Sequence, residues 1–84
     1  MKAIIIEDET AAVNSLKAIL QQNSVADIEV VAELESIEDS IEWFQNSSPP
    51  DIIFMDIHLA DGLAFTIFEQ VEVAAPVVFT TAYD

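Results

Sequence analysis

The stretch "DIIFMDIHLADG", Asp51 to Gly62, decides the fold, because an apolar run within it ends at a single acidic residue. The segment Asp51–Met55 has no polar interior position, which is typical of a buried strand. Asp56 stands at the end of that run, and "LADG", Leu59 to Gly62, has the composition of a turn. The stretch therefore predicts a buried strand that delivers a carboxylate to one edge of a sheet.

Outward from this stretch, strand patterns alternate with helix patterns along the chain. Short apolar runs predict strands over Lys2–Glu7, Asp27–Leu34, Asp51–Met55 and Val77–Thr81. Apolar residues at helical spacing predict helices over Thr10–Asn23, over Ser36–Ser47 with Ser36 and Asp39 as an approximate capping box, and over a segment marked by Leu63, Ile67 and Val71 and closed at Ala75 and Pro76. This order predicts an α/β fold with right-handed crossovers and a parallel sheet covered on both faces.

The size and charge of the chain restrict the classes of function. Its 84 residues are enough for one domain, residues 1–84, and we expect no second domain in this chain. The formal net charge of −14 repels phosphate backbones and anionic membranes, so we expect neither direct nucleic-acid contact nor membrane binding. The same charge attracts cations, which makes a metal site a reasonable expectation.

The N-terminal segment and the residue usage indicate a cytoplasmic protein. The chain has no Cys, which fits a reducing compartment. The start "MKAIIIEDE" has too short an apolar run before its acidic residues for a signal peptide or a membrane span.

Acidic and hydroxyl side chains follow three of the predicted strands. Ligands of a doubly wound parallel sheet bind at the carboxyl ends of its strands, and the residues found there are Glu7, Asp8, Glu9, Asp56, Thr80 and Thr81. If the first and third strands are neighbours, their carboxylates share one crevice and need a hard cation such as Mg²⁺. A carboxylate beside Mg²⁺ can attack a phosphoryl group, which makes Asp56 the natural nucleophile.

Simpler interpretations exist for each residue alone. Asp56 could cap the turn that follows it, and Glu9 reads as a solvated residue in the first turn of a helix. His58 has no second His or Cys with which to complete a zinc site. Thr80 alternates with Thr81 along its strand and is expected to face a helix.

Three segments carry a family resemblance. "IIIEDE" (Ile4–Glu9), "DIIFMDIHLADG" (Asp51–Gly62) and "VVFTTAYD" (Val77–Asp84) resemble the receiver domains of two-component response regulators, closest to those with a LytTR-type DNA-binding domain. The resemblance implies a flavodoxin-like, three-layer α/β/α fold with strand order 2-1-3-4. It also implies that Asp56 accepts a phosphoryl group from a histidine kinase with Mg²⁺, and that the chain is not itself an enzyme.

The resemblance assigns a role to each matching position. Asp56 would be the phosphoacceptor and a metal ligand, and Asp8 a direct Mg²⁺ ligand. Glu7 would be the companion acid that acts through water. His58 would contribute its backbone carbonyl to the metal, and Thr81 would be the switch residue that turns toward the new phosphate.

The chain departs from the family pattern at its C-terminal side. The resemblance covers about the first two thirds of a receiver domain, without the fifth strand and the last two helices, and we expect the effector domain to lie outside this chain. The Lys that ends the family's fifth strand has no counterpart, since Lys2 and Lys17 stand elsewhere. The fourth strand, Val77–Thr81, then becomes an apolar edge, and we expect self-association through that edge or through the face of the first helix.

Two other functions compete with the phosphoacceptor. A pseudo-receiver or structural module that is not phosphorylated would suit the missing Lys. A hydrolase that forms an aspartyl phosphate is disfavoured, because it generally needs a second acid two residues after the nucleophile, where this chain has His58.

Overall fold

A four-stranded parallel sheet forms the centre of the molecule. The computed structural model describes residues 1–22 and 27–80. The strands β1 (Lys2–Ile6), β2 (Glu29–Leu34), β3 (Ile52–Met55) and β6 (Val77–Phe79) lie in the order β2-β1-β3-β6. All three strand pairs are parallel. The predicted order 2-1-3-4 is therefore confirmed, with β6 as the fourth predicted strand.

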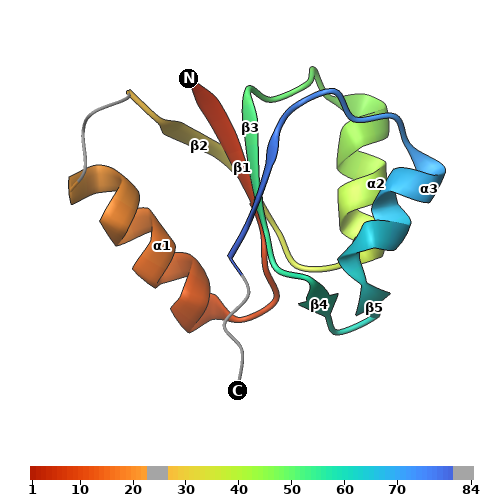
Figure 1. The fold of residues 1–84 in the computed structure, drawn as a ribbon, viewed down its shortest axis with the longest axis horizontal. Coiled ribbons are helices and arrows are strands. Elements are labelled where there is room, and N and C mark those ends of the chain that lie inside the picture. Colours follow the sequence, from red (N-terminus) through yellow and green to blue (C-terminus); the bar gives the residue numbers. More distant parts are fainter. Residues whose placement is uncertain (23–26, 81–84) are drawn as a thin grey trace.

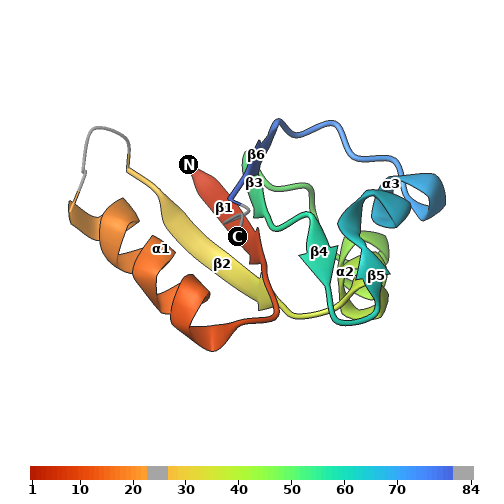
Figure 2. The same ribbon diagram turned by 60° about the horizontal axis from the view of Figure 1, so that its bottom comes forward.

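Helices cover both faces of the sheet and give three layers. Figures 1 and 2 show α1 (Thr10–Gln22) on one side, and α2 (Ile37–Asn46) with α3 (Ile67–Gln70) on the other. The flavodoxin-like α/β architecture is confirmed. Among the described residues, no helix combines the length and the apolarity that a membrane span requires.

The central strand β1 separates two apolar cores. Ile4 and Ile6 belong to the core on the α2 side, and Ala3 and Ile5 to the core on the α1 side. These four side chains are at most 1% exposed. The alternation of side chains along a strand explains why an unbroken apolar run is needed here, since both faces of β1 are buried.

The second helix begins as the sequence predicts. Ser36 is its N-cap, with an extended backbone, and its Oγ accepts a hydrogen bond from the Asp39 backbone N–H at 3.0 Å. Glu38 and Asp39 lie in the first turn, where negative charge suits the helix dipole.

The third helix is shorter than predicted, and the predicted turn is a hairpin. Leu63 belongs to β5 (Gly62–Leu63), which pairs with β4 (His58–Leu59) in an antiparallel two-stranded sheet. A 3₁₀ turn, η1 (Ala64–Thr66), leads into α3, which ends at Gln70. The prediction of one helix from Leu63 to Val71 was wrong, because Leu63 is held extended by its pairing and Val71 returns to an extended backbone. Ala64 and Ile67 are fully buried, and Phe68 and Val71 pack against the same core.

The edge strand β6 is apolar and exposed, as predicted. Val78 is 43% and Phe79 is 44% exposed, and the Phe79 ring lies 5.3 Å from that of the exposed Phe65. On the first helix, Ile19 is 53% exposed. Asn23 and Thr81, the predicted last residues of the first helix and of the fourth strand, lie outside the described residues.

Candidate functional site

The carboxyl ends of β1 and β3 lie side by side. Ile6 pairs with Met55 in the parallel register, and the Asp56 backbone N–H donates to the Ile6 carbonyl at 3.0 Å. On the other side of β1, the Glu7 N–H donates to the Leu34 carbonyl of β2 at 2.9 Å. Two ladders thus fix the backbone of Glu7 and Asp56 at the same edge of the sheet.

Three carboxylates meet at this edge. One oxygen each from Glu7, Asp8 and Asp56 can be chosen so that all lie within 4.8 Å of one another. Glu7 is buried, Asp56 is half-buried and Asp8 is exposed, so the cluster runs from the interior of the protein to solvent. Carboxylate oxygens at this spacing suit a hard divalent cation that keeps some of its water, and the donor set therefore fits Mg²⁺.

The buried member of the cluster is electrostatically perturbed. The pKa of Glu7 is raised to about 7, chiefly by burial and in smaller part by the nearby charge of Asp56 and the contact with Asp8, while a hydrogen bond from a backbone N–H acts in the opposite direction. That N–H belongs to Glu9 and reaches the Glu7 Oε2 at 3.1 Å. A cation in the cluster would favour the charged form of Glu7 and reverse the direction of this shift.

His58 begins the hairpin that follows Asp56. Its side chain is exposed. The Ala64 N–H donates to the Ile57 carbonyl at 2.8 Å, so His58 and Leu63, the next opposed pair, form the non-hydrogen-bonded pair of the antiparallel ladder. The His58 carbonyl therefore lies outside the pairing of the hairpin, which suits its predicted role as a metal ligand.

The hydroxyl residues at the end of β6 are only partly described. The Thr80 N–H donates to the Met55 carbonyl at 2.9 Å, which places Thr80 beside the end of β3. Thr80 also lines a cavity of about 280 Å³ together with Glu7 and residues of α1, so it faces a helix as predicted. Thr81 lies outside the described residues, and its switch role stays a prediction.

Sequence reasoning missed one ionised residue near the site, Asp61. Its carboxylate, in the β4–β5 hairpin, accepts hydrogen bonds from the backbone N–H groups of Ile37 at 3.0 Å and of Glu38 at 3.3 Å. These hydrogen bonds lower the pKa of Asp61, the Ile37 N–H most strongly. No local pattern could have revealed the contact, because the partners are 24 residues apart along the chain.

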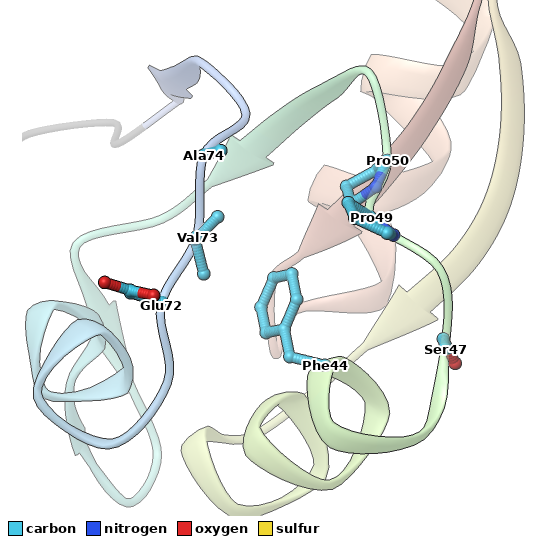
Figure 3. Close-up of a pocket in the computed structure, with 7 residues that line it drawn as sticks. All are labelled: Phe44, Ser47, Pro49, Pro50, Glu72, Val73 and Ala74. Atoms are coloured by element: carbon cyan, nitrogen blue, oxygen red, sulfur yellow. The ribbon is translucent and has the colours of Figure 1, made fainter.

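A second cavity lies at the opposite edge of the sheet, where β3 begins. Figure 3 shows the residues that line its volume of about 370 Å³: Phe44, Ser47, Pro49, Pro50, Glu72, Val73 and Ala74. Glu72 is the one ionisable residue among them. This cavity lacks the converging charged groups that mark the acidic edge, so the acidic edge is the candidate site.

Comparisons with known proteins agree with this geometry. The family model described as response regulator receiver domain matches residues 3–84. The sensory transduction protein LytT of Bacillus cereus is 33% identical over 87 aligned residues that include all of this chain and 34% of the relative. The transcriptional regulatory protein LytR of Staphylococcus aureus is 31% identical, with the same coverage of 100% and 34%. The chain thus spans about a third of the length of these curated relatives.

A solved structure is similar in fold. The anti-anti-sigma factor PhyR from Bartonella quintana superposes with a TM-score of 0.68 over 93% of this chain and 31% of that chain. At 23% identity, this likeness supports the architecture alone.

Proposed function

This chain belongs to the family of response regulator receiver domains, and we propose that it is a phosphoacceptor that takes a phosphoryl group onto Asp56. The single observation that carries the proposal is the meeting of Glu7, Asp8 and Asp56 within 4.8 Å at the carboxyl edge of a parallel sheet. A receiver of this kind is a stoichiometric acceptor rather than an enzyme that turns over a substrate.

The proposed reaction is a phosphoryl transfer between two side chains. A carboxylate oxygen of Asp56 forms a bond to phosphorus while the N–P bond of a phosphohistidine breaks, and the departing imidazole nitrogen takes the electron pair and then a proton. Asp56 is half-buried, at the boundary between the buried Glu7 and the exposed Asp8. The hydrogen bond from its backbone N–H to the Ile6 carbonyl at 3.0 Å ties the backbone of Asp56 to the end of β1 and so helps to hold the acceptor in place.

The acidic neighbours prepare the site for charge that arrives with the phosphoryl group. We assign Asp8 as a direct ligand of Mg²⁺, Glu7 as its companion through water and the His58 carbonyl as a further ligand. When bound, Mg²⁺ supplies positive charge that neutralises the phosphoryl oxygens. Thr81 is the proposed hydroxyl that turns toward the phosphate after transfer.

The partners follow from this role. We propose a histidine kinase as the phosphoryl donor. We also propose that the signal passes from this receiver domain to an effector domain outside this chain, of the DNA-binding type. A cytoplasmic location is proposed with them, since both partners act there.

A pseudo-receiver remains the second candidate, and one observation favours it. The two Lys residues of the chain stand away from the acidic edge: Lys17 pairs with Glu33 at 2.7 Å, and Lys2 begins β1 at the opposite edge. A phosphate on Asp56 would therefore lack an ammonium partner from these residues.

Phosphorylation with acetyl phosphate and Mg²⁺ tests the proposal. Intact-mass spectrometry should show the gain of one phosphoryl group in the wild-type chain, sensitive to hydroxylamine, and none in Asp56→Asn. Asp8→Asn should slow the gain, while Asp39→Asn, an exposed acid of α2, serves as the matched control. If no Asp56-dependent gain occurs in the chain or in a form extended through a complete receiver domain, the pseudo-receiver is the better interpretation.

A further inference from the structure

The β4–β5 hairpin is fastened to the beginning of α2 by two contacts. Both oxygens of the Asp61 carboxylate lie within hydrogen-bond distance of the Ile37 N–H, at 3.0 and 3.1 Å, and one oxygen also reaches the Glu38 N–H at 3.3 Å. Gly62 packs against the same residue: a Cβ built on it would lie 3.2 Å from the Cδ1 of Ile37. Figure 1 shows the hairpin beside the end of α2 where the chain enters the helix.

The same hairpin is the continuation of the phosphoacceptor. Asp56 ends its strand, and His58 begins β4 two residues later. The Ala64 N–H bond to the Ile57 carbonyl at 2.8 Å closes the base of the hairpin. The side chain of Leu59 is only 7% exposed and anchors the hairpin in the core. The position of the His58 carbonyl therefore depends on where this short hairpin is held.

The helix has a second cap that does not involve the hairpin. Ser36 Oγ accepts from the Asp39 N–H, whereas Asp61 accepts from Ile37 and Glu38. Two different side chains thus satisfy the first N–H groups of α2. The helix alone would be served by local capping residues, but a carboxylate that reaches it from the hairpin also fixes the hairpin.

We propose that Asp61 is a positioning residue of the phosphoacceptor site, which holds the β4–β5 hairpin against α2 and thereby sets the His58 carbonyl for the metal. This inference rests on the proposed function, because it concerns the same site. Mg²⁺ demands near-ideal octahedral geometry, so a displaced carbonyl ligand weakens its binding. Residues that orient metal ligands from outside typically change metal affinity by about 10–100-fold when removed.

Three variants of the full chain separate positioning from helix stability. Asp61→Ala removes the tether, Asp61→Asn keeps an acceptor oxygen, and Ser36→Ala removes the other cap of the same helix while the hairpin contact stays. Calorimetric titration with MgCl₂ and with MnCl₂ gives the metal Kd of each. We expect affinity on the order of tenfold weaker for Asp61→Ala, a partial recovery for Asp61→Asn, and a change below about twofold for Ser36→Ala.

Amide hydrogen exchange without metal tests the tether by itself. In Asp61→Ala the Ala64 amide, which closes the hairpin, should exchange faster together with Ile37. In Ser36→Ala the Asp39 amide should exchange faster while Ala64 keeps its wild-type protection. If Asp61→Ala does not fold, Asp61→Asn is measured in its place, with the same direction expected.

The outcomes distinguish the two proposals. Equal metal affinity in wild type and Asp61→Ala, or an equal loss in Ser36→Ala, would overturn the positioning role even if Asp56 is phosphorylated. Unchanged exchange at Ala64 would overturn the tether. A wild-type chain that binds neither metal and gains no phosphoryl group would refute the proposed function and with it the positioning role, whatever the exchange data show.

Discussion

Replacement of Glu7 by glutamine should stabilise the metal-free protein at neutral and alkaline pH. Burial raises the pKa of the Glu7 carboxyl from 4.5 to about 7 in the folded chain. A carboxyl whose pKa is raised by folding binds its proton more tightly in the folded state than in the unfolded state. Below pH 4.5 Glu7 is protonated in both states and its ionisation does not affect the free energy of unfolding. As the pH rises, ionisation lowers the free energy of unfolding, and the full loss is reached above about pH 7.

The magnitude follows from the shift. Each pKa unit corresponds to about 1.4 kcal/mol, so ionised Glu7 lowers the free energy of unfolding by about 3 kcal/mol at pH 8. This is a large share of the stability of so small a domain. The amide oxygen of the Glu7→Gln variant can still accept the Glu9 N–H, which Glu7 accepts at 3.1 Å, and the substitution removes the repulsion from Asp56 and Asp8.

Urea unfolding between pH 5 and pH 8, followed by Trp43 fluorescence and by circular dichroism, measures the effect. Without metal, wild type should lose stability relative to Glu7→Gln as the pH rises, while Glu9→Gln, the exposed neighbour, should follow wild type. Saturating Mg²⁺ at pH 8 should restore stability to wild type by about 3 kcal/mol at a hundred times the Kd, and by less to Glu7→Gln. A pH-independent difference between the two proteins would refute the assignment of a raised pKa to Glu7.

Three further predictions concern stability and association. Ile53→Ala, in the fully buried part of β3, should cost about 2–5 kcal/mol in urea unfolding, and a cost below about 1 kcal/mol would contradict the packing described for the sheet. Ser36→Ala should lower stability by about 1 kcal/mol through loss of the cap on the Asp39 N–H, whereas Lys17→Ala, which breaks an exposed ion pair, should change it by less than about 1 kcal/mol. The exposed apolar edge of β6 should drive self-association that Val78→Lys reduces in analytical ultracentrifugation, and a monodisperse wild-type monomer would count against an association role for this edge.

The parts of the fold that sequence predicts well are those set by burial and by local capping. The run from Ala3 to Ile6 is apolar at every position because both faces of β1 are covered, and a run this short is typical of a buried strand. The second helix was located by Ser36, whose side chain bonds a backbone N–H three residues later. The first feature is set by burial along the whole segment, and the second by a hydrogen bond between residues close in sequence.

The region after Asp56 resisted prediction for the opposite reason. Leu63 has the spacing of a helical residue relative to Ile67, yet it pairs with His58 across a turn and stays extended. Two residues of antiparallel pairing leave too short an alternation to outweigh a helical pattern. In the sequence, Gly62 indicates a turn, and in the structure it has a positive φ of 139°. A glycine does not, however, predict how long the strands beside the turn are.

The candidate site also has one part that the sequence predicts and one part that only the structure shows. Parallel strands bring their carboxyl ends to one edge, so Glu7, Asp8 and Asp56 could be expected to meet, whereas the link from Asp61 to α2 is visible only in three dimensions. Nothing in the packing of the fold requires a charge at Glu7, because a glutamine would occupy the same place and still accept the Glu9 N–H. The ionised Glu7 carboxylate destabilises the domain when no cation is bound, so cation binding explains its presence better than a role in fold stability does. The change in the free energy of unfolding on addition of Mg²⁺ is therefore the most direct test of the site.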